Sequence, residues 1–136
     1  TLTHQNVVGT PSYMAPEQAA SAPLSHRNDL FSLGAILYRA LTGRPAFTGD
    51  SPMAILYQVV ENMPQRPSDV ASRLHEDVDL VLAIALAKAP HSRFDSGEEL
   101  ASALEKALRG NLPEKLRLKA RLLIKQHPWA EPFGAS

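Results

Sequence analysis

The densest apolar stretch of the chain lies between Asn28 and Leu41, where nine of fourteen residues are apolar. At 100° per residue these positions surround most of the helix cylinder and do not keep to one stripe. Such a pattern is typical of a helix that other elements enclose, so we expect a central core helix here. Asn28 or Asp29 can cap its first turn, and Gly43 follows where a left-handed residue is favoured. Gly34 costs about 1 kcal/mol in helix propensity, which is tolerable where a neighbouring backbone comes close.

Four further helices are predicted, and long loops separate them. Their ranges are 52–62, 74–89, 97–109 and 113–126. Ser51 and Pro52 supply an N-cap and a first helical residue, and Ser96 with Glu99 forms a capping signature. The spacing of Val78, Val81 and the other apolar residues in the 74–89 stretch predicts a largely buried helix. We therefore expect a mainly α fold of five helices around a buried central helix, without a sheet.

Composition excludes several classes of protein. The net charge is zero, which gives no general electrostatic case for nucleic-acid binding. The chain has no cysteine, so disulfides and thiolate metal sites are excluded. The five histidines show neither His-x3-His nor HExxH spacing, and no metal site is expected. No run of eighteen apolar residues predicts a membrane span, while membrane association stays open.

The last predicted helix carries most of the clustered positive charge of the chain. Its basic residues are Lys115, Arg117, Lys119, Arg121 and Lys125. The simplest interpretation is a solvated face, and a partner or anionic-lipid site is the alternative.

Most signatures of catalysis are missing from the sequence. It contains no GxSxG, GxGxxG or GxxxxGK[ST] motif, so no phosphate-cradling loop is predicted. Loops as long as those expected here usually serve binding.

One constellation of motifs is specific. Gly9 to Glu17 reads GTPSYMAPE, and twelve residues later Asp29 heads DLFSLG at the start of the central helix. ALTGRPAF follows that helix, and KAPHSRF follows the next buried one. These four blocks, in order over residues 1–109, resemble the C-terminal half of a serine/threonine protein kinase domain. The resemblance is greatest to the bacterial eukaryotic-type kinases.

The resemblance implies a substrate-binding loop. Thr10 would bond to the catalytic Asp and its neighbouring Lys, which favours a Ser or Thr acceptor; a plain turn residue is the alternative. The residues from Pro11 to Met14 would wall the pocket for the substrate residue after the acceptor. The implied substrate-binding residues are Gly9, Thr10, Pro11, Ser12, Tyr13 and Met14.

Further residues would support this loop. Glu17 would pair with Arg93, and Asp29 would cap backbone amides of the catalytic loop. Thr1 and Thr3 lie where such kinases phosphorylate themselves, and a phosphate there would order the loop through arginine. They could equally be unmodified polar residues of a loop.

The catalytic parts of a kinase do not occur in this sequence. A Gly-rich loop, a β3 Lys, an αC Glu, HRD-x4-N and DFG would all lie upstream of Thr1. We therefore expect no catalytic residue and no bound ATP or Mg²⁺ in this fragment, although the full-length protein would use both. Its partners would be protein substrates and the missing N-terminal lobe and catalytic loop. Because that loop would cover the central helix, the fragment should expose apolar surface.

The expected organisation is the C-terminal part of a kinase domain over residues 1–110, followed by a basic helix and irregular tail over 111–136. The kinase domain would be cytoplasmic, and a membrane anchor beyond Ser136 would not be visible here. The alternative function is a pseudokinase or truncated large-lobe module that acts as a scaffold or competitor. A structural helical domain with chance motifs is a third interpretation.

Overall fold

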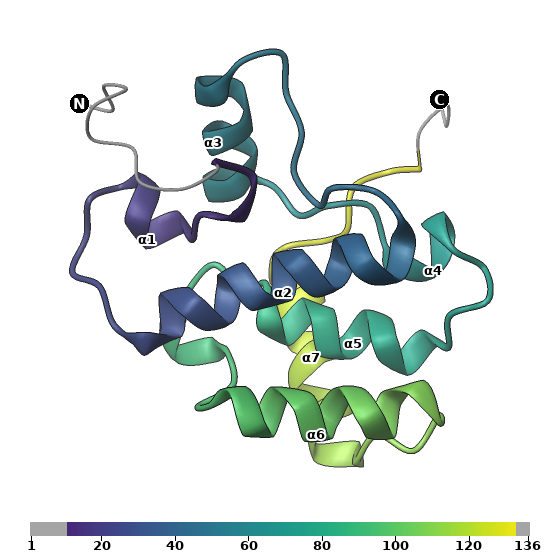
Figure 1. The fold of residues 1–136 in the computed structure, drawn as a ribbon. Coiled ribbons are helices and arrows are strands. Elements are labelled where there is room, and N and C mark those ends of the chain that lie inside the picture. The colour runs from purple at the N-terminus through teal and green to yellow at the C-terminus, as the bar shows by residue number, and fades with distance from the viewer. Residues whose placement is uncertain (1–10, 133–136) are drawn as a thin grey trace.

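The computed structural model describes residues 11–132, and this part of the chain is helical (Figure 1). The helices are α1 (Pro16–Ala19), α2 (His26–Thr42), α3 (Pro52–Glu61), α4 (Pro67–Val70), α5 (Glu76–Ala85), α6 (Gly97–Leu108) and α7 (Glu114–Gln126), with 3₁₀ turns η2 (Pro11–Tyr13) and η3 (Pro90–Ser92). No strand occurs within 11–132, where Gln65 and Ala130 form an isolated parallel β-bridge. The predicted mainly α class is confirmed.

Helices α2 and α5 lie at the centre of the fold. Figure 1 shows α2 across the middle, with α1 and α3 on one side and α5 on the other. Both α6 and α7 pack against α5, so α5 is covered on several sides. Residues 77–86 are accordingly all buried. Within the described range, no helix combines the length and the apolar content needed to cross a bilayer.

Helix α2 begins two residues earlier than predicted. The N-cap is Ser25, whose hydroxyl accepts the Arg27 N–H at 3.2 Å. The Asn28 side chain reaches back and accepts the Ser25 N–H at 3.1 Å. Neither Asn28 nor Asp29 is the N-cap residue, because Ser25 takes the extended backbone that this position needs, but Asn28 takes part in capping as the third helical residue, within the capping box. Gly43 ends the helix at φ 79°, as predicted.

One side of α2 is buried and another is open. Phe31 and Ala35 are fully buried and Tyr38 is 2% exposed, whereas Leu33 and Ile36 are 37% and 50% exposed. The helix is central to the fold without being enclosed all round. Leu33 and Ile36 are apolar side chains that stay exposed on the open side of α2.

The remaining predicted helices are present, and two details differ. Helix α5 spans Glu76–Ala85, so it begins two residues later and ends four residues earlier than the predicted 74–89. The later start has a cap, because the His75 ring accepts the Asp77 N–H at 2.9 Å. The stretch predicted as a loop at 63–72 contains the single turn α4. Asp79 holds that turn, accepting from the Ser68 N–H at 2.8 Å and from its hydroxyl at 2.6 Å. Sequence periodicity carries no signal for a helix this short.

Gly34 lies where α2 and α5 cross closely. A Cβ added there would stand 2.9 Å from the Ala85 Cβ and 3.3 Å from Leu86 Cδ2. The close approach predicted for this glycine is confirmed, and its neighbour is α5.

We expect Gly34→Ala to lower the free energy of unfolding by about 1–2 kcal/mol, because overpacking outweighs the gain in helix propensity. Urea denaturation followed by circular dichroism measures the change. The matched control is Gly97→Ala in the first turn of α6, where an added Cβ meets nothing within 4 Å. An equal effect at both positions would contradict the close crossing of α2 and α5.

Candidate functional site

A buried ion pair joins the APE segment to Arg93, which directly follows the turn η3 after α5. Arg93 Nη1 donates to Glu17 Oε2 at 2.6 Å, and Nη2 donates to Oε1 at 2.8 Å. The arginine side chain is fully buried and that of Glu17 is 7% exposed. Bidentate geometry of this kind is the strongest arrangement for an arginine and a carboxylate. The pairing expected between these two residues is therefore present, across 76 positions of sequence.

Arg93 also binds the backbone around it. Its Nε donates to the Ala87 carbonyl at 2.8 Å, Nη1 to that of Arg27 at 2.9 Å, and Nη2 to that of Lys88 at 3.1 Å. With the two bonds to Glu17, these contacts use all five N–H donors of a guanidinium group. One side chain thus connects α1, the start of α2 and the segment after α5.

Aromatic rings cover the same junction. The Arg93 guanidinium carbon lies 4.9 Å from the centroid of the Phe31 ring. Phe31 stacks on Phe47 with 5.8 Å between centroids and 16° between planes. Both rings are buried, so water is excluded from one side of the ion pair and the charges interact in a low-dielectric setting.

The segment before Glu17 is held against α2. Ser32 Oγ donates to the Tyr13 carbonyl oxygen at 2.5 Å. Arg39 Nη1 donates to the Tyr13 hydroxyl at 3.1 Å. Met14 is 7% exposed and Ala15 is fully buried. This part of the predicted substrate loop is therefore anchored by its backbone and by two buried side chains.

The structure describes only some of the predicted site residues. Gly9, Thr10, Thr1 and Thr3 lie outside the described residues. Pro11, Ser12 and Tyr13 form η2, directly before the buried Met14. Their role in substrate binding stays a prediction.

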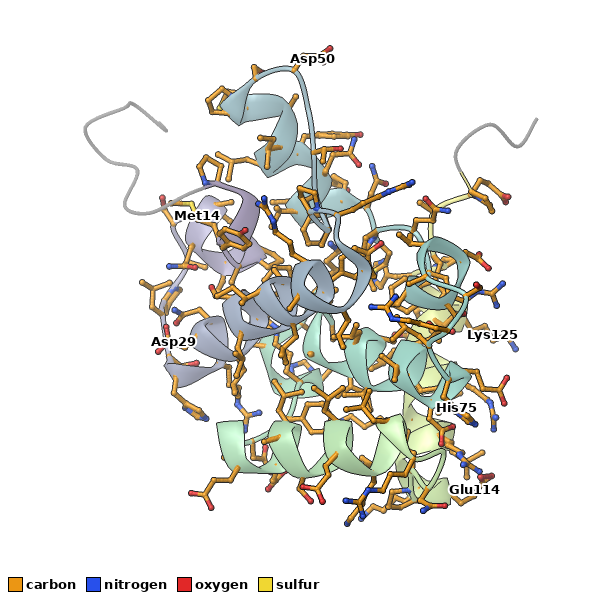
Figure 2. The ribbon with its side chains drawn as sticks, turned by 45° about the vertical axis from the view of Figure 1, so that its right-hand side comes forward. Met14, Asp29, Asp50, His75, Glu114 and Lys125 are labelled. Carbon is orange, nitrogen blue, oxygen red and sulfur yellow. The ribbon has the colours of Figure 1, made fainter. Side chains whose placement is uncertain are left out.

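Asp29 lies at the surface, in the first turn of α2 (Figure 2). Its Oδ1 accepts the Asn28 side-chain amide at 3.3 Å. Since Ser25 performs the N-cap, α2 does not require the Asp29 carboxylate as a cap. That carboxylate can accept hydrogen bonds from another segment, and its proposed role at the catalytic loop stays a prediction.

The sequence places Lys88 in the KAPHSRF block but does not predict the contacts of its ammonium group. Its ammonium donates to the Val59 carbonyl at 2.6 Å and to the Asn62 carbonyl, at the end of α3. It also lies 4.8 Å from the centroid of the Phe47 ring. Burial, reinforced by the charge of Arg93, lowers the pKa of Lys88 to about 7. Only the fold could reveal this, because α3 and α5 are distant in sequence.

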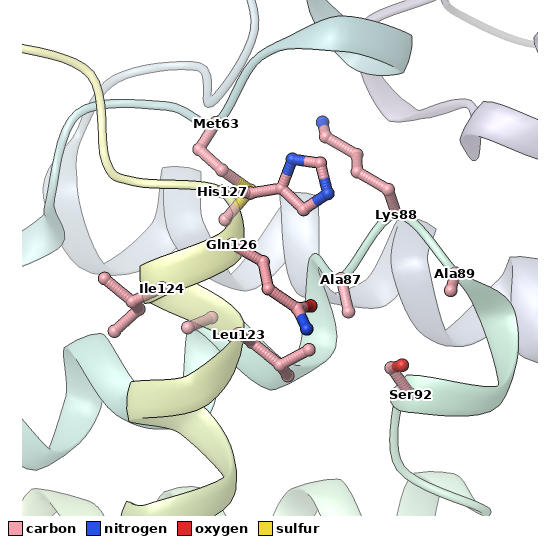
Figure 3. A pocket seen from close by; sticks show the side chains of 10 residues that line it. Met63, Ala87, Lys88, Ala89, Ser92, Leu123, Ile124, Gln126 and His127 are labelled. Carbon is pink, nitrogen blue, oxygen red and sulfur yellow. The ribbon is translucent and has the colours of Figure 1, made fainter.

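A small cavity of about 50 Å³ borders Lys88. Figure 3 shows Leu123, Gln126 and His127, from α7 and its end, around this cavity opposite Ala87 and Lys88. Ligand pockets in proteins are about 300–1,000 Å³, so this one is too small for a nucleotide. Across residues 11–132, no three His, Asp or Glu side chains cluster closely enough to hold a metal ion.

A second ion pair joins α7 to α5, with Asp77 buried and the Arg117 side chain 28% exposed, and sequence reasoning missed it. Arg117 Nη2 donates to Asp77 Oδ2 at 2.8 Å, and Nε donates to Oδ1 at 3.2 Å. Asp77 also accepts the Leu112 N–H at 3.1 Å. Burial alone would raise the pKa of Asp77, but the bonds from Arg117 and Leu112 outweigh it and lower the pKa. Forty residues separate this pair, and no local pattern marks it.

Comparisons with known proteins agree with this geometry. A family model described as the protein kinase domain matches residues 1–130. The serine/threonine-protein kinase PknB of Mycobacterium tuberculosis is 43% identical over 108 residues, covering 79% of this chain and 17% of that protein. A probable serine/threonine-protein kinase of Corynebacterium efficiens is 42% identical over 103 residues, covering 73% of this chain and 16% of that protein. The chain spans less than a fifth of the length of these relatives.

A solved structure is similar as well. The crystal structure of the PknI kinase domain of Mycobacterium tuberculosis matches with a TM-score of 0.59 and 30% sequence identity. The match covers 74% of this chain and 36% of that chain.

Removal of the buried arginine should be costly. We expect Arg93→Met to lower the free energy of unfolding by about 3–5 kcal/mol, because Glu17 would keep a buried charge without a partner. Urea denaturation at neutral pH measures the loss.

The control for Arg93→Met is Arg66→Met. Arg66 pairs with Asp69 at 3.0 Å, but its side chain is 50% exposed, so the expected cost is below about 1 kcal/mol. A similar small cost for Arg93→Met would show that the buried pair does not constrain the fold.

Lys88 should make stability depend on pH. The folded chain holds this proton with a pKa of about 7, against 10.5 for an ordinary lysine. At pH values between these two pKa values, the unfolded state binds more protons than the folded state. The free energy of unfolding therefore rises with pH, by up to about 1.4 kcal/mol per pH unit. Urea denaturation at several pH values in this window gives the slope. We expect Lys88→Met to flatten it and Lys115→Met, at an exposed lysine, to leave it unchanged.

Proposed function

We propose a function from one premise: this chain belongs to the protein kinase family, as the large-lobe part of a bacterial-type serine/threonine kinase domain. The protein that contains it would transfer the γ-phosphoryl group of ATP to Ser or Thr hydroxyls of protein substrates. This segment would supply the activation loop, the substrate-docking loop and the core of the large lobe. The observation that carries the proposal is the buried Glu17–Arg93 pair, which holds the APE segment on the helical core.

The substrate loop would work through its position. Tyr13 is bound to α2 and Glu17 to Arg93 in the segment after α5, so Gly9 and Thr10 would extend from a rigid base. Thr10 would bond to a catalytic Asp and Lys supplied from outside this chain, and would orient a Ser or Thr acceptor. Pro11, Ser12, Tyr13 and Met14 would border the next substrate residue. Rigid support of this kind favours catalysis, since small misplacements of reacting groups are costly.

Asp29 and the threonines would complete this part of the site. The exposed carboxylate of Asp29 would accept backbone amides of the catalytic loop, a role for which its position beside the open side of α2 is suitable. Phosphate on Thr1 or Thr3 would attract arginine side chains and order the activation loop.

Among residues 11–132 no three His, Asp or Glu side chains cluster to hold Mg²⁺, and the sequence contains none of the kinase motifs that bind the phosphates of ATP. The cavity beside Lys88 is too small, and the buried carboxylates of Glu17 and Asp77 are already bound to arginines. The cofactors that kinases of this family use would therefore be bound by other parts of the protein, and this segment would be inactive alone. That protein would act in the cytoplasm on protein substrates.

We propose a division after residue 110 between the kinase core and the segment that follows, although the family model itself extends to residue 130. The support is a change of element, because Gly110 at φ 73° ends the turn after α6 and α7 then begins with a strongly basic sequence. Helix α7 packs against α5, so the later segment is attached to the core by direct contact.

Kinase activity of the intact protein tests this function. Purified residues 1–136 should show no ATP turnover, whereas the intact protein should phosphorylate a Ser- or Thr-containing peptide. Thr10→Ala in the intact protein should lower kcat/KM by about a hundredfold or more, because the acceptor would be misplaced. Radiolabelled phosphate transfer measures both.

The control is Thr48→Ala, at an exposed loop threonine, which should leave activity unchanged. Turnover by residues 1–136 alone would show that this segment itself contains the catalytic residues, which would contradict the proposal. An intact protein that folds but transfers no phosphate would favour the pseudokinase or large-lobe binding module.

A further inference from the structure

Helix α7 turns one face toward the core, and the structure identifies that face. Ala120 is fully buried against α5, and the Arg117–Asp77 ion pair fixes the rotation of the helix about its axis. The apolar side chains that pack inward are Leu116, Leu123 and Ile124. The opposite face of α7 therefore points away from the protein.

That outward face carries two leucines at its centre. Leu118 is 55% exposed and Leu122 is 64% exposed. Four residues separate them, so they lie one turn apart on the same side of the helix. Leucines are common on protein surfaces singly, but a pair in register forms a small apolar ridge. The sequence alone could not say which leucines of this helix face outward.

Basic side chains flank the ridge on both sides. At 100° per residue, Lys115 and Lys119 fall on one side of the leucines, and Arg121 and Lys125 fall on the other. Lys115, Arg121 and Lys125 are exposed. Figure 2 shows Lys125 near one end of α7 and Glu114 at the other, along one edge of the molecule.

Several carboxylates lie near this face, including the 64% exposed Glu114 of α7 and Asp95, whose pKa is lowered mainly by Arg27 and also by the charge of Lys119. We do not count Arg117 among the cations of this face, because Asp77 neutralises its charge. Glu114 lies in the first turn of α7, 3.9 Å from Arg117. Glu76 and Asp79 line the same hollow as Arg121, so the positive charge is weakest beside that arginine. The ridge nevertheless has four basic flanking residues, on a chain whose net charge is zero.

We propose that the outward face of α7 docks on an anionic lipid surface. Leu118 and Leu122 would enter the headgroup region, and the lysines and Arg121 would lie against the phosphates. An apolar ridge with basic residues on both flanks is the arrangement of helices that lie in the plane of a membrane interface. Positive charge near a surface of anionic lipids is attracted without specific geometry, which suits side chains that are spread along the helix.

Other occupants fit this face less well. A second copy of the chain would bring the same positive charges together, which is unfavourable. An acidic protein would satisfy the charge, but specific carboxylate partners use bidentate arginine geometry, and three of the four flanking cations are lysines. The leucines also project outward, which suits insertion into a soft surface. The inference does not depend on kinase activity.

Flotation with lipid vesicles tests the docking of this chain. We expect recovery with vesicles of phosphatidylcholine and phosphatidylglycerol in equal parts, little recovery with phosphatidylcholine alone, and loss of binding at high salt through screening. Lys115→Gln with Lys125→Gln should weaken partition by about twenty-fivefold, at about fivefold for each basic side chain. Leu118→Gln with Leu122→Gln should weaken it by about tenfold or more.

Matched controls are available elsewhere on the surface. Leu24 is 60% exposed and Arg44 is exposed, so Leu24→Gln and Arg44→Gln should leave vesicle binding unchanged. Circular dichroism should show the same helix content in every variant, because the altered side chains are exposed. Binding to neutral vesicles as strong as to anionic ones, or binding that ignores the α7 substitutions, would overturn the proposal. Binding to poly-glutamate but not to vesicles would also overturn it and would indicate an acidic protein partner.

Discussion

The burial of Arg93 is the constraint on which the rest of the structure depends. A guanidinium group without exposed surface needs a counter-charge and an acceptor for each donor. Glu17 supplies the charge, and carbonyls in the first turn of α2 and after α5 supply the other acceptors. Because these groups come from three separate parts of the chain, satisfying one side chain fixes the relative positions of all three. In this chain the APE segment is thus held in place because its Glu17 is needed to neutralise a buried arginine.

Helix α5 provides the other half of this arrangement. It is covered by α2 on one side and by α6 and α7 on others, and its buried residues form much of the core. Gly34 allows α2 to approach it, and Lys88, just beyond its end, reaches back to the carbonyls that end α3. The open side of α2, with Leu33 and Ile36, contrasts with this coverage. Under the proposed function, further segments of the large lobe would lie on α2 and cover that apolar surface.

Much of the fold could be predicted because its signals are local. Helical periodicity, Pro52, Ser96 and Gly43 placed the long helices within a few residues, and the motif blocks identified the family before any geometry was known. Errors arose where two local signals competed. Ser25, Asn28 and Asp29 are all good capping residues, and only the backbone conformation decided for Ser25. The turn α4 was missed because its stability comes from Asp79, which is eleven positions away.

The sequence by itself determined the helical class, the family and the residues of the APE segment, since each depends on spacing over short stretches. Only the tertiary structure decided which side chains share a buried environment. The Arg117–Asp77 pair, the pKa of Lys88 near 7 and the outward position of Leu118 and Leu122 all follow from contacts between helices. Burial and the desolvation of charge depend on neighbours in space, and a pattern along one helix does not contain those neighbours.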